Sequence, residues 1–343
     1  MIAPALHHRL SSLSIREPQI FQNFTVFPLV GESLTDPDFV MLKEALEKGF
    51  VTVEEIDESG SVPELEVVNN SDHFVLLLDG EEVAGAKQNR VLNTTILLDK
   101  KSRTRIPVSC TEQGRWAYNS DKFSHSGNIM SSKLRRRKSG SVSRSLKAKK
   151  SFLSDQGEVW DSIQEMHCLA GTSSATGAMK DAYESRQKDL EDYTGAIHQV
   201  ENQVGLLVLI DGKPAGCDLF SRPESFATIS EHLTRSYAMD AITSREKVSP
   251  GTVTVEDAES FVKELSELKE DAFDSVGVGR DLRYEGPHRN GSALLVEDTP
   301  IHAAFFSVED DENERRRSSS STRRGRSLMQ RIRDDIEKED EDS

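Results

Sequence analysis

The longest apolar runs of this chain are five residues long, which is the length of a buried strand. They lie at residues 74–78 and 206–210, and both are far shorter than the roughly 20 residues that a membrane-spanning helix needs. Each run is followed by an Asp-Gly pair, Asp79-Gly80 and Asp211-Gly212, which is a strong signal for a tight hairpin turn. The sequence therefore predicts a fold of short strands and tight turns, with no membrane as a partner.

The two runs also resemble each other. Residues 76–80 read LLLDG and residues 208–212 read VLIDG, and a glycine follows each of them, Gly85 and Gly216. An old duplication of a strand–turn–strand unit explains the similarity, and so does the general likeness of Asp-Gly hairpins. The sequence leaves both explanations open.

Periodic apolar positions and helix-end signals predict helices between the strands. An early helix is expected with Thr35 or Asp36 as its cap, Pro37 in its first turn and Gly49 at its end. Further strands are expected at 91–98, 105–110, 293–296 and 302–308, and further helices at 155–170, 178–193, 226–242 and 255–273. This pattern predicts an α+β fold, strand-rich, with mainly antiparallel sheets and several flanking helices, in a single domain at 15–308.

Three segments are expected to lack fixed structure. Residues 1–14 are expected to form a flexible N-terminus. Residues 124–154 are expected to form a mobile basic loop, because residues 133–150 hold nine Lys or Arg, no acid and little that could be buried. Residues 309–343 are expected to form a disordered, charged tail, since they carry a serine run and no apolar face.

The net charge and the spacing of the cysteines indicate the cellular compartment and the partners that the chain can have. The 343 residues carry a net charge of -16, which disfavours non-specific binding to nucleic acid. The start of the chain has no apolar signal-like segment, and Cys110, Cys168 and Cys217 form neither a disulfide framework nor a zinc spacing. We therefore expect a cytoplasmic protein without a nucleic-acid partner.

Two short motifs carry the most specific signal in the chain. Residues 80–90 read GEEVAGAKQNR, residues 107–116 read PVSCTEQGRW, and Gln156, Val159 and Trp160 follow. Together they resemble the ARG and rhodanese-phosphatase-superfamily-associated protein domain over about residues 15–308. The name of that family records an association with ADP-ribosylglycohydrolase and rhodanese-phosphatase proteins. The resemblance therefore implies a place in NAD-derived or ADP-ribose chemistry, and it brings no established catalytic residues.

The first motif concentrates side-chain donors directly after a glycine, at Lys87, Gln88, Asn89 and Arg90. Lysine and arginine suit a phosphate, while glutamine and asparagine can read a base or a ribose. These four residues are therefore candidate ligand-binding residues. A polar edge strand tied into structural hydrogen bonds would give the same pattern.

The second motif offers two candidate catalytic residues, Cys110 as a nucleophile and Glu112 as a general base. Beside them, the candidate ligand-binding residues are Gln113, Arg115 and Trp116. A structural interpretation competes with this one, with Cys110 as a small buried hydrophobe, Glu112 in a salt bridge to Arg115 or Arg90, and tryptophan in the core. No metal is predicted, because no histidine stands at ligand spacing from the acidic pairs, and no cofactor follows from either motif.

We expect the two motifs to converge in space. Residues 91–105 can form a strand, a charged turn at 99–102 and a return strand, which would bring Arg90 near residues 106–110 and Glu112 near Arg90 or Lys87. Two functions fit such a cluster. One is the binding or processing of an anionic nucleotide of the NAD or ADP-ribose type, and the other is a non-catalytic scaffold or interaction module with a partner protein. A poised acid, base or nucleophile in an enclosed cleft would favour the enzyme.

Overall fold

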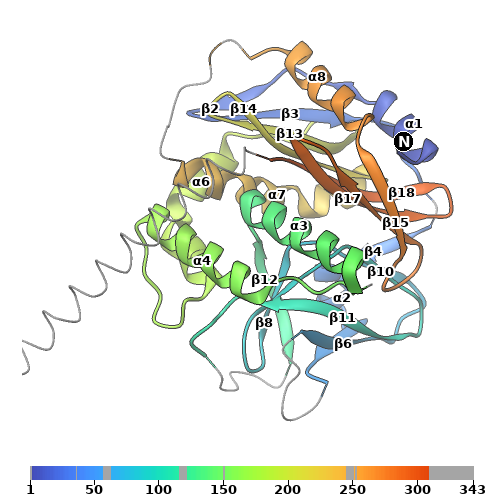
Figure 1. The fold of residues 1–343 in the computed structure, drawn as a ribbon, viewed down its shortest axis with the longest axis vertical. Helices are drawn as coiled ribbons and strands as arrows, with labels where there is room; N and C mark the ends of the chain where they lie inside the picture. The colour runs from blue at the N-terminus through green and yellow to red at the C-terminus, as the bar shows by residue number, and fades with distance from the viewer. Residues whose placement is uncertain are drawn as a thin grey trace, which may run out of the picture.

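A nine-stranded sheet forms one layer of the protein (Figure 1). The structure is a computed structural model, and it describes residues 2–35, 37–56, 63–115, 122–149, 151–244, 251 and 253–308. The strands of this sheet run in the order β1, β3, β13, β14, β18, β17, β16 and β15, with β2 paired to β3. Their bounds are β1 (Ser14–Ile15), β2 (Gln19–Phe21), β3 (Phe24–Val30), β13 (Gln203–Ile210), β14 (Lys213–Phe220), β15 (Lys269–Asp274), β16 (Arg280–Glu285), β17 (Arg289–Val296) and β18 (Thr299–Ser307). The hairpin expected at Asp211-Gly212 joins β13 to β14 and is confirmed.

Two smaller sheets form the other layer. One has the order β12, β8, β9, β11, β6 and β5, and the other has the order β10, β7 and β4. Their bounds are β4 (Phe39–Met41), β5 (Val51–Glu54), β6 (Glu64–Asn69), β7 (Phe74–Leu77), β8 (Glu81–Gly85), β9 (Arg90–Leu92), β10 (Ile96–Leu98), β11 (Arg103–Cys110) and β12 (Phe123–Ile129). β4 pairs with β7 in parallel, whereas the neighbours in the larger sheets are antiparallel. The expected α+β, strand-rich fold with mainly antiparallel sheets is confirmed.

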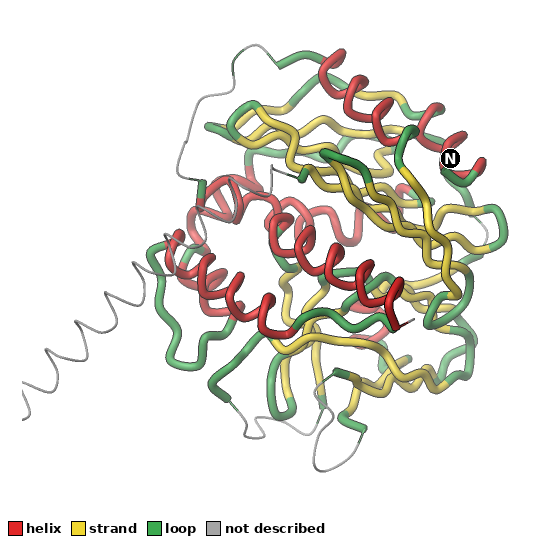
Figure 2. Tube along the Cα trace, in the orientation of Figure 1, coloured by secondary structure: helices red, strands yellow, loops and turns green. Residues whose placement is uncertain are grey.

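The helices fall into two main groups (Figure 2). α3 (Ser132–Lys149) and α7 (Pro223–Thr243) lie between the two layers, and α4 (Gln156–Ala170), α5 (Met179–Ser185) and α6 (Gln187–Gly195) lie beside them at one side of the molecule. The helices α1 (Pro4–Ser11) and α8 (Val255–Leu265) cover the outer face of the nine-stranded sheet, and α2 (Leu42–Glu47) packs against the smaller sheets. Neighbouring strand residues point to opposite faces of a sheet, so Leu206 packs with Leu233 of α7 on the inner face. Leu207 belongs to the core cluster on the outer face, together with Leu6 of α1 and Phe261 of α8.

The segment expected to be a mobile basic loop contains β12 and the helix α3, so that prediction was wrong. Arg135 and Lys138 of α3 are buried, with exposed fractions of 0% and 2%. The reason for the error is that charge density was taken to exclude burial, although each charge can be paired inside the protein. Leu134, Val142 and Leu146 stand eight and four residues apart and are buried, which is a helical spacing that the sequence already displayed.

Three other expectations were wrong. The N-terminal segment is not free, because it forms α1 and buries Leu6 and Leu10. The early helix starts at Leu42 rather than near Asp36, because residues 39–41 pair with β7 as a strand. The expected helix at 255–273 ends at Leu265, and its remainder belongs to β15.

The Asp79-Gly80 pair makes a tight turn without making a hairpin. The amide of Glu81 donates to the carbonyl of Leu78 at 3.1 Å, yet β7 pairs with β4 and β10, whereas β8 pairs with β9 and β12. The two Asp-Gly units therefore have different structures, and the sequence echo between them has no counterpart in the fold. The charged tail expected at 309–343 lies outside the described residues. Within the residues that the structure describes, no helix is long and apolar enough to cross a membrane.

Candidate functional site

The two sequence motifs meet in the structure, as expected. Cys110 of β11 pairs with Arg90 of β9, and the amide of Thr111 donates to the carbonyl of Asn89 at 3.0 Å. The connection between them differs from the simple hairpin that we expected, because β10 leaves this sheet and pairs with β7. The convergence therefore comes from the β9–β11 pairing itself.

The motif residues 86–90 and 110–115 form one group, which we call the motif cluster. Within it, the carboxylate of Glu112 accepts three hydrogen bonds. Its Oε2 accepts hydrogen bonds from Arg115 Nε at 2.8 Å and from the Asn89 amide at 3.4 Å, and its Oε1 accepts from the Thr176 hydroxyl at 2.9 Å. Burial opposes ionisation, but the hydrogen bonds from Arg115 and Thr176 outweigh it and hold the pKa of Glu112 below its usual range. Its partner is thus Arg115 rather than Arg90 or Lys87, and a carboxylate held in this way is a weak base.

Cys110 lies beside it with an exposed fraction of 0%. Its thiol donates to Gln88 Oε1 at 3.1 Å, and its backbone is held on both sides by the amide group of Gln156 on α4, at 2.7 and 2.9 Å. Burial raises the pKa of the Cys110 thiol. A nucleophilic cysteine needs the opposite shift, because the thiolate is the reactive form.

Gln88 and Arg90 complete the interior of the motif cluster. Gln88 donates to the carbonyl of Glu112 at 2.8 Å, and its Oε1 accepts from Arg90 Nη1 at 2.9 Å. Arg90 has an exposed fraction of 0%, and its Nη2 lies 3.8 Å from Glu55 Oε1. The Nε and Nη2 groups of Arg90 make no hydrogen bond within the described part of the chain. Lys87 is buried as well.

The remaining candidate residues lie at the edge of the motif cluster or outside the residues that the structure describes. Gln113 is exposed and Arg115 is half-buried. Arg115 also donates to the Ala86 carbonyl at 2.9 Å and to Asn89 Oδ1 at 3.2 Å. Trp116 lies outside the described residues.

A small polar loop that the sequence reasoning did not single out fastens the second motif. The amide of Gly114 donates to the Thr176 carbonyl at 2.7 Å, and the amide of Met179 donates to the Thr111 carbonyl at 2.9 Å. A Cβ atom at Gly114 would lie 2.9 Å from the Thr176 Cα, so the close approach requires glycine at this position. The only signal for this contact was the small, polar composition of residues 171–177 between two helices.

A second polar cluster, which the sequence reasoning also missed, joins α3 to the nine-stranded sheet. Asp218 of β14 accepts two hydrogen bonds from Arg135, at 3.0 and 2.7 Å, one from Tyr237 at 2.8 Å, and lies 3.1 Å from His302 Nε2. Burial opposes its ionisation, but the charge of Arg135 outweighs this and holds the pKa of Asp218 well below its usual range. We call these four residues, together with Lys138 and Asp79, the α3 network.

The α3 network also reaches the smaller sheets. Lys138 donates to Asp79 and, at 2.7 Å, to the carbonyl of Leu92. Thr95 accepts from the Asp79 amide at 3.1 Å and lies 3.0 Å from His302 Nδ1. This chain of contacts connects both layers of the fold through α3, and every member is buried.

A model of the ARG and rhodanese-phosphatase-superfamily-associated protein domain matches residues 12–306, which includes both motifs and α3. The chain belongs to this family. No curated protein and no solved structure matches it.

In this family domain, β8 places two further carboxylates in the interior. Glu81 lies 2.8 Å from His125 Nε2, while His125 Nδ1 accepts from the Gly127 amide at 3.0 Å. Both ring nitrogens of His125 are therefore engaged, which leaves no free lone pair for proton abstraction. Burial raises the pKa of Glu82 to about 7 although Thr111 donates to it at 2.6 Å. The described residues contain no group of His, Cys, Asp and Glu that could hold a metal ion.

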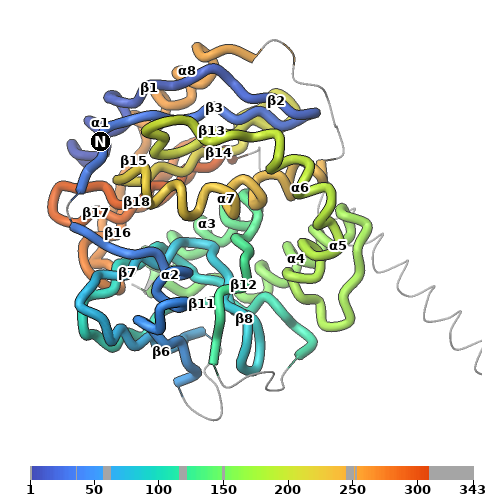
Figure 3. The backbone as a smooth tube through the Cα atoms, turned by 180° about the vertical axis from the view of Figure 1, so that it is seen from behind, coloured from blue at the N-terminus to red at the C-terminus, as the bar shows by residue number. Residues whose placement is uncertain are grey.

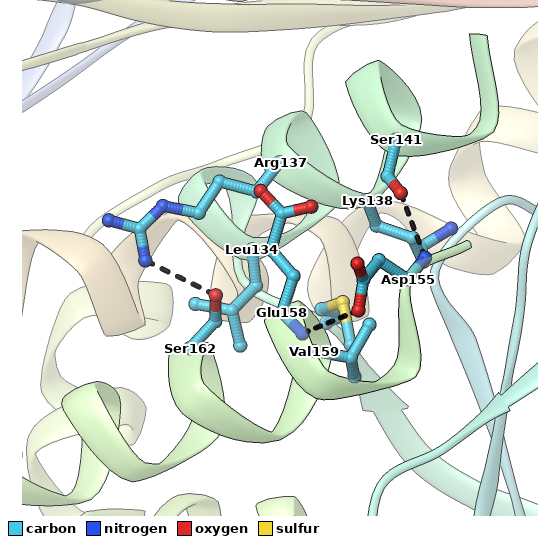
Figure 4. A pocket seen from close by; sticks show the side chains of 9 residues that line it. Leu134, Arg137, Lys138, Ser141, Asp155, Glu158, Val159 and Ser162 are labelled. Carbon is cyan, nitrogen blue, oxygen red and sulfur yellow. Dashed lines mark hydrogen bonds between the residues drawn. The ribbon is translucent and has the colours of Figure 1, made fainter. Parts of the chain in front are cut away.

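Two of the hollows in the described part of the domain lie against its helices. A cleft between α3 and α4 offers about 10 Å³, which is room for about one water molecule. Figure 4 shows its walls, where Arg137 donates to Ser162 and the amide of Asp155 donates to Ser141. A groove of about 400 Å³ lies beside α6 and α7, and it shares no residue with the motif cluster.

Proposed function

We propose that this domain is a non-catalytic scaffold or interaction module, in which the motif cluster holds the fold together rather than performing chemistry. The observation that carries the proposal is the bonding of Glu112. Its carboxylate is occupied by Arg115, Thr176 and the Asn89 amide, and these partners would have to be lost before it could take a proton from a substrate.

The state of Cys110 supports the same proposal. Its thiol is buried, its pKa is raised, and its hydrogen goes to Gln88 Oε1. An enzyme of the nucleophilic type needs an accessible thiolate next to a base. Cys110 and Glu112 as catalytic residues remain a prediction from sequence, and their surroundings favour the structural role.

Turnover assays test the proposal directly. The purified protein is incubated with NAD and with ADP-ribose, the compounds that the family association suggests, and the products are separated by chromatography. We expect no product above the buffer control in the wild type, in Cys110→Ser or in Glu112→Gln. Product formation by the wild type that Cys110→Ser or Glu112→Gln abolishes would overturn the proposal and establish an enzyme.

A second candidate function is the binding of an anionic nucleotide of the ADP-ribose type. The observation in its favour is Arg90, whose Nε and Nη2 groups are buried and make no hydrogen bond within the described residues, the acid beside Nη2 being Glu55 at 3.8 Å. Buried donors normally have acceptors, and a phosphate suits a guanidinium in this position.

Thermal unfolding with and without ADP-ribose tests this second function, because a ligand that binds the native state raises the melting temperature. The expected result is a rise in the wild type and in Arg105→Ala, and none in Arg90→Ala. Arg105 is an exposed arginine of the neighbouring strand β11, outside the motif cluster. Arg90→Ala that loses much stability yet keeps the ligand-induced rise would favour the purely structural network.

A further inference from the structure

The groove beside α6 and α7 is large enough for a small molecule. Its volume is about 400 Å³, and ligand sites typically span roughly 300–1,000 Å³. Figure 3 shows α6 and α7 next to each other beside β3 and β13, and the groove is lined by residues of these four elements and of the segment after α6. Val26, Leu206 and Phe226 give the groove an apolar floor that belongs to the main core.

The rim of the groove carries negative charge. Glu191 of α6 and Glu231 of α7 are both exposed and both line it. The side chain of Glu191 accepts a hydrogen bond from Gln187 at 2.6 Å, whereas the side chain of Glu231 makes no hydrogen bond or ion pair with the residues that the structure describes. No lysine or arginine is found among the described residues of the lining, where His198 is the other titratable side chain.

One cation adjoins the rim without a hydrogen bond or ion pair to either carboxylate among the described residues: Arg235 stands four residues after Glu231 on α7 and bonds Gln187 instead. It follows the lining residue Thr234 and donates to Gln187 Oε1 at 2.9 Å. The polar side chains deeper in the groove are bonded within the protein, since Gln203 donates to the Gly205 carbonyl and Thr234 donates to the Ser230 carbonyl. Two carboxylates above an apolar floor are therefore the features that a ligand would meet.

We propose that this groove binds a small organic cation with an apolar body, the charge resting near Glu191 and Glu231 and the body on the apolar floor. Two carboxylates attract a cation and repel an anion of equal size. Burial of the apolar body on Val26, Leu206 and Phe226 adds the hydrophobic contribution. The inference is independent of the proposed function, because the groove and the motif cluster have no residue in common.

Three probes of the same size and different charge test this proposal. They are 2-phenylethylamine as the cation, 2-phenylethanol as the neutral compound and phenylacetate as the anion, each titrated calorimetrically into the full-length protein at low salt. The amine is expected to bind at millimolar concentration, the alcohol about tenfold to 25-fold more weakly, as for two exposed charge contacts of about threefold to fivefold each, and phenylacetate not at all. Absence of amine binding, or binding of phenylacetate as tight as that of the amine, would overturn the proposal.

Variants locate the binding. Glu191→Gln and Glu231→Gln are each expected to weaken the amine about threefold to fivefold, and the double variant should bind the amine no better than the alcohol. Glu224→Gln, an exposed acid of the same helix α7 outside the lining, is the matched control and should leave binding unchanged. Ser230→Trp should fill the groove and abolish binding of the amine and the alcohol alike.

Amine binding that survives both the double variant and Ser230→Trp would place the site elsewhere and contradict the proposal. The result is separable from the test of the proposed function, since Cys110→Ser and Glu112→Gln should bind the amine as the wild type does. A failure in the groove therefore leaves the turnover assay unaffected, and product formation in that assay leaves the groove unaffected.

Discussion

The motif cluster and the α3 network are both buried assemblies of charged groups, but they occupy different places in the fold. Asp218 sits between the layers with four donors around it and an exposed fraction of 0%. Glu112 sits at the edge of the smaller sheets, and its partner Arg115 has a side chain that is 17% exposed. The comparison teaches that the most distinctive motifs of the sequence need not form the most deeply buried charge assembly, and we expect the α3 network to contribute more to stability. The charge-rich stretch that looked solvated forms the centre of the molecule.

The largest effect is expected for Asp218→Ala. The substitution leaves Arg135 buried without its main partner, which should lower the free energy of unfolding by about 3–5 kcal/mol. Equilibrium unfolding in urea measures it, with Tyr237→Phe as a control that removes one hydrogen bond and costs about 1 kcal/mol. A loss below that of the control would mean that the α3 network contributes little.

A smaller loss is expected for Glu112→Ala, because Arg115 keeps access to water. Removal of hydrogen bonds to a charged group should cost about 1.5–3 kcal/mol in urea unfolding. Glu66→Gln, which removes the exposed pair with Arg103 on the same sheet, is the control and should cost less than about 1 kcal/mol. If both variants lost the same free energy of unfolding, the bonds of Glu112 would stabilise the fold no more than an exposed ion pair does.

The pH dependence of stability distinguishes Glu82 from both clusters. Its pKa in the folded protein is raised from 4.5 to about 7, so the folded state binds more protons than the unfolded state between these values. Glu82 therefore makes stability fall as the pH rises from 4.5 to 7. Glu82→Gln should remove this decline and be more stable than the wild type above pH 7. A difference curve that is flat across this window would show that Glu82 is ionised throughout.

The smallest change in stability is expected for Cys110→Ser. A serine hydroxyl can donate to Gln88 Oε1 as the thiol does, so the free energy of unfolding should change by about 1 kcal/mol, measured in urea. A loss as large as that of Asp218→Ala would mean that the packing around the thiol, rather than the hydrogen bond, holds the motif cluster together.

The elements that the sequence predicted well are those with local signals. The helix α4 was expected at 155–170 from its periodic apolar positions, and the structure places it at Gln156–Ala170. Asp155 caps it with its side chain, and Gly171 ends it in a left-handed conformation. The convergence of the motifs was also predictable, because Arg90 and Cys110 stand on strands that are close in sequence. Burial of charge was not, because the partners of Arg135 and Lys138 come from distant parts of the chain.

The same limit applies to the candidate site. Glu112 was expected to meet Arg115 or another arginine of the motifs, but the hydroxyl of Thr176, which completes its bonding, lies 64 residues away. The sequence presents side chains that are able to react, and it does not show how many of their bonds are already used. The number of bonds that a side chain already makes depends on tertiary contacts. These contacts determine whether a carboxylate acts as a base or has a structural role.

The reactivity of Cys110 in the native protein is the most direct test of the structural role of the motif cluster. The protein is treated with iodoacetamide at several pH values, and the labelling of each cysteine is followed by mass spectrometry, with the exposed Cys168 as the internal control. Cys168 should be labelled at once, while Cys110 should be labelled only as fast as the protein unfolds, because its thiol is buried and its pKa is raised. Rapid labelling of Cys110 in the folded protein, with a titration midpoint below that of Cys168, would contradict the account.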